Sequence, residues 1–196
     1  MSLEEDLISC GCWPVCGVDE AGRGPLAGPV VAAAVIIVPS SRLRSVVRDS
    51  KLLTENKREE IFGILTSSDE VFIGISIVDA ALIDEMNILQ ATLKAMEEAV
   101  NKLTIEPRYA LVDGNALPRL PCQGIPVIAG DESEPSISAA SIIAKVTRDR
   151  LMVHMDEQYP GYGFARHKGY PTKAHVTAIR TLGVCPIHRR TFKGVC

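Results

Sequence analysis

The strongest constraint on the fold is a run of nine apolar residues, "VVAAAVIIV", at positions 30–38. The run has about half the length needed to cross a bilayer, so it indicates a buried element of a globular protein. Valine and isoleucine favour an extended chain, and an unbroken apolar run is typical of a strand buried on both faces. We therefore expect a buried strand over residues 27–38, inside a sheet that other layers cover.

The rest of the chain alternates between short strand patterns and helical patterns. Alternating or short apolar runs predict further strands at 16–19, 71–77, 109–112 and 125–129. Apolar periodicity and capping residues predict helices at 55–65, 89–103, 136–158 and 172–182. This order is typical of an α/β fold, a mixed sheet with helices on its faces. The 196 residues contain no repeat or linker, so we expect a single domain, 1–196.

Acidic residues stand where the predicted strands end. Asp19 and Glu20 follow the first strand, Asp113 follows the strand at 109–112, and Asp131 follows the strand at 125–129. Any one of them could be a turn residue, because Asp-Gly is common in turns. Four converging carboxylates would repel one another unless divalent cations neutralised them, and hard oxygen ligands favour Mg²⁺ or Mn²⁺. Two such ions can activate water and stabilise the leaving oxygen of a phosphodiester.

The formal net charge of −3 hides a strong asymmetry. Residues 145–196 carry a net charge of +7, which leaves −10 for the first 144 residues. The basic residues of this part are Lys145, Arg148, Arg150, Arg166, Lys168, Lys173, Arg180, Arg189, Arg190 and Lys193. A basic, helical C-terminal part beside an acidic body fits a phosphate-binding surface, although a solvated basic helix face would give the same composition.

The cysteines and histidines do not indicate a metal or nucleophile site. None of the six cysteines forms a C-x-x-C pair, so we expect reduced thiols instead of zinc ligands. The four histidines (His154, His167, His175 and His188) are expected at the surface or facing nucleic acid. The chain starts with acidic residues and has no signal-peptide pattern, so a cytoplasmic location without membrane contact is expected.

Seven sequence blocks resemble the ribonuclease HII family and together span nearly the whole chain. In chain order they are "GVDEAGRGPLAGPVVAAAV", "DSKLLTENKRE", "IDEMNILQATLKAME", "LVDGNALP", "GDESEPSISAASIIAKVTRDR", "YGFARHKGYPTKAH" and "CPIHRRTF". The resemblance implies an RNase H-like fold, a mixed five-stranded sheet flanked by helices with additional C-terminal helices.

The resemblance also implies an activity. An enzyme of this family hydrolyses the RNA strand of RNA/DNA hybrids and nicks duplex DNA on the 5′ side of an embedded ribonucleotide, leaving 3′-hydroxyl and 5′-phosphate ends. Two divalent ions, Mg²⁺ or Mn²⁺, take part. The partners are therefore hybrid duplexes and ribonucleotide-containing DNA, and we expect a monomer.

The family's catalytic and metal-binding acids correspond to Asp19, Glu20, Asp113 and Asp131, with Asp19 shared by both ions. We expect Glu20 to reach the site because the chain turns there, since successive strand side chains point to opposite faces. Asp149 is expected to be an exposed, ion-pairing residue outside the site.

The resemblance places substrate contacts in three segments. Gly22, Arg23 and Gly24 correspond to the segment whose backbone reads the ribose 2′-hydroxyl, the group that distinguishes RNA from DNA. Tyr170 corresponds to an aromatic ring against the next sugar, and Lys51 is a candidate phosphate contact.

Three alternatives remain at this point. A ribonuclease HIII-type enzyme would carry an additional N-terminal domain and lysine where Arg23 stands, and fewer than twenty residues precede Asp19 here. A non-catalytic hybrid-binding module would not need four acids in its cleft. A nucleotide or phosphate-metabolite hydrolase would not need the basic C-terminal part.

Overall fold

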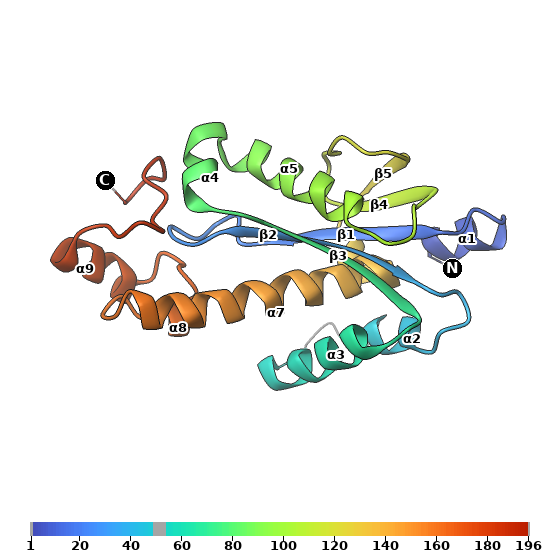
Figure 1. Ribbon diagram of the computed structural model, residues 1–196, viewed down its shortest axis with the longest axis horizontal. Helices are drawn as coiled ribbons and strands as arrows, with labels where there is room; N and C mark the ends of the chain where they lie inside the picture. The colour runs from blue at the N-terminus through green and yellow to red at the C-terminus, as the bar shows by residue number, and fades with distance from the viewer. Residues whose placement is uncertain (1, 49–53, 196) are drawn as a thin grey trace.

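The computed structural model describes residues 2–48 and 54–195, and a mixed sheet runs through its middle (Figure 1). Its strands lie in the order β3-β2-β1-β4-β5. The pairs β1/β2 and β2/β3 are antiparallel, whereas β1/β4 and β4/β5 are parallel. The strands are β1 (Val15–Ala21), β2 (Val30–Ile37), β3 (Val71–Val78), β4 (Tyr109–Asp113) and β5 (Gln123–Val127).

Helices cover both faces of the sheet, as the sequence predicts (Figure 1). One face carries α2 (Leu43–Arg48), α3 (Glu55–Ser67) and α7 (Pro135–Gln158). The other carries α4 (Ala80–Met86) and α5 (Ile88–Asn101). The remaining helices are α1 (Leu3–Ser9), α6 (Gly130–Ser133), α8 (Phe164–His167) and α9 (Lys173–Leu182). In the described residues, no helix is both long and apolar enough to span a membrane.

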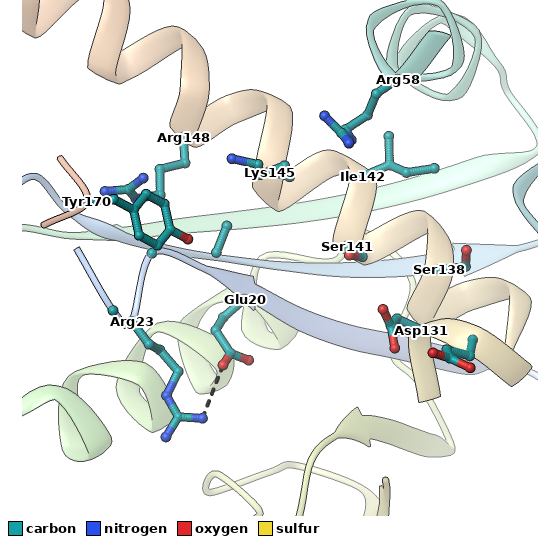
Figure 2. Close-up of a pocket in the computed structure, with 14 residues that line it drawn as sticks. Glu20, Arg23, Arg58, Asp131, Ser138, Ser141, Ile142, Lys145, Arg148 and Tyr170 are labelled. Atoms are coloured by element: carbon teal, nitrogen blue, oxygen red, sulfur yellow. Dashed lines mark hydrogen bonds and ion pairs between the residues drawn. The ribbon is translucent and has the colours of Figure 1, made fainter. Parts of the chain in front are cut away.

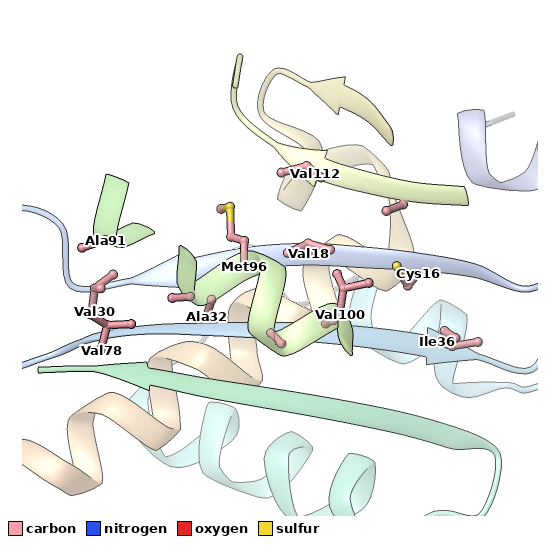
Figure 3. Packing of buried hydrophobic residues seen from close by; sticks show 14 of the residues in the cluster. Cys16, Val18, Val30, Ala32, Ile36, Val78, Ala91, Met96, Val100 and Val112 are labelled. Atoms are coloured by element: carbon pink, nitrogen blue, oxygen red, sulfur yellow. The ribbon is translucent and has the colours of Figure 1, made fainter. Parts of the chain in front are cut away.

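The apolar run is the central strand β2, and it is buried on both faces. Ala32, Ala34 and Ile36 belong to the core under α5, part of which Figure 3 shows, and the residues between them belong to the core under α7. The strand begins at Val30 and not at residue 27. The three preceding residues form a loop instead, because buried arginine side chains hydrogen-bond their carbonyl groups.

A glycine sets the distance between β1 and α7. A Cβ atom on Gly17 would lie 2.1 Å from the backbone nitrogen of Ile137, so only glycine allows this approach. The small residues Ala139 and Ala140, both fully buried, continue the contact along the helix. The first turns of α7 therefore lie directly over the strand that carries Asp19.

Two buried glutamates connect the start of the chain to the start of α7. The Glu134 carboxylate accepts hydrogen bonds from the backbone N–H groups of Leu3 (3.3 Å) and Glu4 (2.8 Å). The Glu4 carboxylate in turn accepts from the backbone N–H and the hydroxyl of Ser136, both at 2.9 Å, and pairs with Arg44. Each glutamate thus caps the other's helix. The seven residues of α1 are too few for an apolar periodicity that would predict a helix from the sequence.

Candidate active site

A half-open groove of about 740 Å³ runs between the end of β1 and α7 (Figure 2). Five segments line it: the β1 end with the loop after it, α6, one face of α7, Arg58 of α3, and Tyr170. The lining residues predicted from the sequence are Glu20, Gly22, Arg23, Gly24, Asp131 and Tyr170. The structure therefore brings acidic and substrate-contact candidates to one place.

Asp19 and Glu20 leave β1 on opposite faces of the sheet. The strand continues to Ala21, and both residues pair with β2, so the expected turn at Glu20 is wrong. Asp19 is buried and faces α7, where Ser141 hydrogen-bonds its carboxylate. Glu20 lines the groove and forms an ion pair with Arg23 at 3.3 Å (Figure 2). The pleat points the two carboxylates to opposite faces of the sheet. Both lie near the same edge because β1 ends at Ala21, directly after Glu20.

Asp113 lies beside Asp19 on the neighbouring parallel strand. The two follow directly after the register pair Val18 and Val112, so they share a face of the sheet. Asp113 Oδ1 accepts a hydrogen bond from the backbone N–H of Gly130 (2.8 Å), which fixes the start of α6 against the end of β4. Asp131 is in the first turn of α6 and not at a strand end, because β5 already ends at Val127. The charges of Asp19, Asp113 and Asp131 lie near enough to affect one another, and Asp131 belongs to a helix instead of a strand end.

The carboxylates repel one another. Burial, with the charges of Glu20 and Asp113, raises the pKa of Asp19 well above its ordinary value. Burial also raises the pKa of Glu20 despite its ion pair with Arg23, and burial with the charge of Asp113 raises the pKa of Asp131. Within the described residues, no basic side chain forms an ion pair with Asp19, Asp113 or Asp131. Among the described residues, Asp19, Asp113 and Asp131 therefore carry negative charge that no ion pair compensates.

The donor chemistry fits a hard divalent cation. All four groups are carboxylates, the ligands that Mg²⁺ and Mn²⁺ prefer. Glu20 and Asp131 line the groove, whereas Asp19 and Asp113 lie side by side on neighbouring strands, outside its lining. In the part of the chain that the structure describes, no three Asp, Glu, His or Cys side chains are already grouped closely enough to hold one ion. Binding would thus require side-chain rotation from the present arrangement.

The loop after β1 has a backbone that only glycine can adopt at its first position. Gly22 has φ +102°, and a Cβ atom there would lie 2.1 Å from Nε of Arg148. Arg148 is itself buried and donates to the carbonyls of Pro29 (3.0 Å) and Ala27 (3.2 Å). The loop is therefore packed directly on a buried guanidinium.

Arg189 fixes the same loop from its other side. Its buried guanidinium donates to the carbonyls of Gly22 (2.6 Å), Arg23 (2.9 Å), Pro25 (2.8 Å) and Gly28 (3.0 Å). Burial, with the charge of Arg148, lowers its pKa to about 9.

The interpretation of residues 145–196 as a solvated phosphate-binding surface is therefore wrong for Arg148 and Arg189, the two of the ten basic residues that are buried. Arg190 is exposed, and its backbone N–H donates to Asp84 of α4 (2.7 Å). The buried arginines support the groove from within.

Tyr170 stands at the mouth of the groove, opposite the loop between β1 and β2 (residues 22–29, here called the glycine loop) (Figure 2). Its ring edge lies 3.7 Å from the Cβ position of Gly24, and 44% of the residue is exposed. A tyrosine with only a packing role would be more deeply buried, so this exposure agrees with the predicted substrate contact. Lys51, the other predicted contact, lies outside the described residues.

Sequence reasoning missed the contribution of α7. Ser138, Ser141, Lys145 and Arg148 all line the groove. Their spacing of three, four and three residues marks one helix face. This spacing predicts that the four side chains lie together, whereas the small residues of this helix by themselves indicate only close packing on the sheet.

Two other expectations need correction. Asp149 pairs with Lys145 at 2.7 Å as expected, but its side chain is only 13% exposed. Of the histidines, only His154 is exposed, whereas His167, His175 and His188 are buried in the C-terminal part. The five described cysteines are free, as expected.

Comparison with known proteins agrees with the site. The family model for ribonuclease HII matches residues 16–195. The ribonuclease HII of Geobacter metallireducens is 54% identical over 192 residues, covering 97% of this chain and 89% of the relative. That of Coxiella burnetii is 50% identical over 181 residues, covering 92% and 89%.

A solved structure confirms the fold. The crystal structure of ribonuclease H2 from Pyrococcus horikoshii superposes with a TM-score of 0.76 at 33% identity, covering 92% of this chain and 94% of the other. The mixed five-stranded sheet flanked by helices and the sequence relationship agree. The chain therefore belongs to the ribonuclease HII family of hydrolytic endonucleases.

Proposed function

We propose that this chain hydrolyses the RNA strand of RNA/DNA hybrids and nicks duplex DNA on the 5′ side of an embedded ribonucleotide, leaving 3′-hydroxyl and 5′-phosphate ends. One observation carries the proposal beyond family membership. Two of the acids, Glu20 and Asp131, line a single groove with the glycine loop and Tyr170, so a cleaved bond and the sugars beside it can be contacted together.

Asp19, Glu20, Asp113 and Asp131 would hold two Mg²⁺ or Mn²⁺ ions, with Asp19 shared between them. Such ions, when bound, supply an activated water and stabilise the leaving oxygen. The ion pair with Arg23 holds the Glu20 carboxylate at the groove. The hydrogen bond from Gly130 to Asp113 holds α6, and with it Asp131, near the end of β4.

The substrate is selected by two elements on either side of the scissile bond. The backbone at Gly22, Arg23 and Gly24 reads the 2′-hydroxyl, because glycine lets the main chain approach a sugar closely. The Tyr170 ring packs on the following sugar, where an added hydroxyl would meet an apolar surface without a hydrogen-bond partner. Together these elements favour a junction from ribose to deoxyribose.

Two alternatives are not favoured. A ribonuclease HIII-type enzyme disagrees with the family model and with the named relatives, which are ribonucleases HII. A non-catalytic hybrid-binding module does not explain why Glu20 and Asp131, carboxylates with raised pKa values, line the groove.

Cleavage of end-labelled duplexes tests the proposal. A duplex with one ribonucleotide should be cut on its 5′ side with Mg²⁺ or Mn²⁺ and left intact with EDTA, and an all-DNA duplex should not be cut. A polymerase should extend the upstream product, which requires a 3′-hydroxyl. Asp149→Asn, on α7 but outside the lining of the groove, is the matched control and should keep activity. Metal-independent cutting, or cutting of all-DNA duplex, would contradict the proposal.

A further inference from the structure

The three buried histidines form a cluster beneath Tyr170, in the C-terminal part of the chain. His167 ends α8, His175 lies in α9, and His188 lies in the segment that follows. The rings of His167 and His175 stack with centroids 4.5 Å apart, and the edge of Phe164 packs near His175. Neither the sequence pattern nor the proposed chemistry assigns a role to these side chains.

The hydrogen bonds fix which ring nitrogens carry protons. A carbonyl oxygen can only accept, and His175 Nδ1 lies 3.0 Å from the Tyr170 carbonyl, so Nδ1 of His175 carries the proton. A neutral imidazole has one N–H, so His175 Nε2 is an acceptor. It lies 3.1 Å from Nε2 of His188, which must therefore be a donor.

The other end of the chain of bonds gives the same answer independently. The backbone N–H of Cys185 points at His188 Nδ1 from 2.9 Å, and the Cys185 thiol lies 3.1 Å from the same atom. His188 Nδ1 is therefore the acceptor, although the Cys185 carbonyl lies farther away at 3.3 Å. Both ends require neutral rings, with the proton on Nδ1 of His175 and on Nε2 of His188. Burial lowers the pKa of His175 to about 4 and also lowers that of His188, in agreement.

The backbone next to Tyr170 is held by both sides of the cluster. His167 Nδ1 accepts from the Gly169 N–H (3.2 Å), while His167 Nε2 donates to the Tyr162 carbonyl (2.9 Å). Gly169 has φ +84°, and its carbonyl accepts from the N–H of Leu26 (2.8 Å) in the glycine loop. The peptide that joins Gly169 to Tyr170 is therefore linked to the histidines and to the loop that faces Tyr170.

We propose that His175 is a positioning residue: the chain of bonds from Cys185 through His188 and His175 to the Tyr170 carbonyl fixes the Tyr170 ring opposite Gly24 and thereby sets the preference for a ribose-to-deoxyribose junction. This inference rests on the proposed function for the meaning of that preference. A proton added to Nε2 of His175 would place two N–H groups face to face across 3.1 Å. A proton added to Nδ1 of His188 would face the backbone N–H of Cys185 across 2.9 Å, so either event breaks the chain of bonds. The titratable groups that contact His175 or His188 are His167, Cys185 and Tyr162.

The first measurement is independent of activity. Long-range ¹H–¹⁵N spectra of the metal-free protein at pH 7 report which ring nitrogen carries the proton. We expect Nδ1 for His175 and Nε2 for His188. A proton on Nε2 of His175, or a doubly protonated ring, would overturn the proposal whatever the enzyme cleaves.

The second measurement compares kcat/KM on a single-ribonucleotide duplex and on a uniform hybrid. His175→Leu loses the donor to Tyr170 and should lower the ratio of the two values about tenfold, the loss expected for one hydrogen bond. His175→Asn keeps an N–H at the δ position and should restore the ratio to within about threefold of wild type.

If His175→Leu does not fold, His188→Gln, which keeps a donor near the ε position, should behave like His175→Asn. An unchanged ratio in His175→Leu, or equal losses in both His175 variants, would overturn the proposal. Absence of cleavage by the wild type would instead reject the proposed function and leave the proton positions to be judged by their spectra.

Discussion

Replacing Arg189 by alanine separates a structural role from a nucleic-acid contact. Composition assigns Arg189 to a phosphate-binding surface, whereas the structure buries it completely and directs it at four backbone carbonyls. Each carbonyl that loses its partner costs about 1 kcal/mol, so Arg189→Ala should destabilise the protein by about 4 kcal/mol. The sum for four bonds to a charged donor would be larger, but the variant also avoids the cost of burying a guanidinium.

The loss should be visible as a lower melting temperature. For a protein of this size, about 4 kcal/mol corresponds to a decrease of about 8–16 °C. The matched control is Arg190→Ala, whose side chain is exposed and whose backbone bond to Asp84 is retained; its melting temperature should stay within about 2 °C of wild type. Differential scanning calorimetry of the two variants measures this difference.

Binding of a duplex at several salt concentrations completes the comparison. A lysine or arginine that contacts a phosphate contributes about 1 to the salt slope of the affinity, so removal of a buried structural arginine should leave the slope unchanged. A normal melting temperature for Arg189→Ala, combined with a slope reduced by about 1, would refute the structural assignment and restore the phosphate contact.

Three further predictions follow from the site. Asp19→Asn should abolish Mg²⁺-dependent cleavage yet be at least as stable as wild type at pH 7 without metal. Folding raises the pKa of Asp19, so the ionised carboxylate destabilises the folded protein at pH values above the pKa of an ordinary aspartate. Urea unfolding and residual cleavage test both parts. Tyr170→Ala should lose most activity on a single embedded ribonucleotide and less on a uniform hybrid, whereas Tyr170→Phe keeps the ring and should lose little; equal losses of Tyr170→Ala on both substrates would return the residue to a packing role. The free energy of unfolding should fall as the pH is lowered from 6.5 towards 4, because the unfolded chain protonates His175 in this window while the folded chain, with a pKa of about 4, does not; an identical pH dependence in His175→Asn would contradict this assignment.

Local sequence pattern predicts the central strand and the positions of Asp19 and Asp113 near strand ends. The apolar run at 30–38 can be satisfied only by burial on both faces, and Asp19 and Asp113 follow runs that must enter the sheet. The substrate-contact candidates depended on the family resemblance, because Gly22 alone is indistinguishable from an ordinary tight turn. The Cβ position of Gly22 on Arg148 gives the physical reason for that glycine.

Burial of charged and aromatic groups could not be predicted in the same way. The partners of Arg189 lie more than 160 residues away in the sequence, so its charge could be counted but not placed. The sequence spacing of His175 and His188 does not indicate a metal site. In the structure the two rings bond to each other and to backbone atoms, and these contacts leave no signal in the sequence. The direction of Glu20 was wrong for a related reason: strand pairing with β2 continues past the carboxylates, which the glycine-rich sequence after them concealed.

The reciprocal capping by Glu4 and Glu134 sets an order of events during synthesis. Apart from Arg44, the partners of Glu4 lie 130 residues or more later in the chain, which takes a ribosome on the order of 10 s to add. A seven-residue helix is too short to persist alone in water, so α1 has no stable form during that time. The α1 segment is thus made before the start of α7 but folds only after it, and until then the Glu4 carboxylate lacks its two hydrogen-bond donors on Ser136.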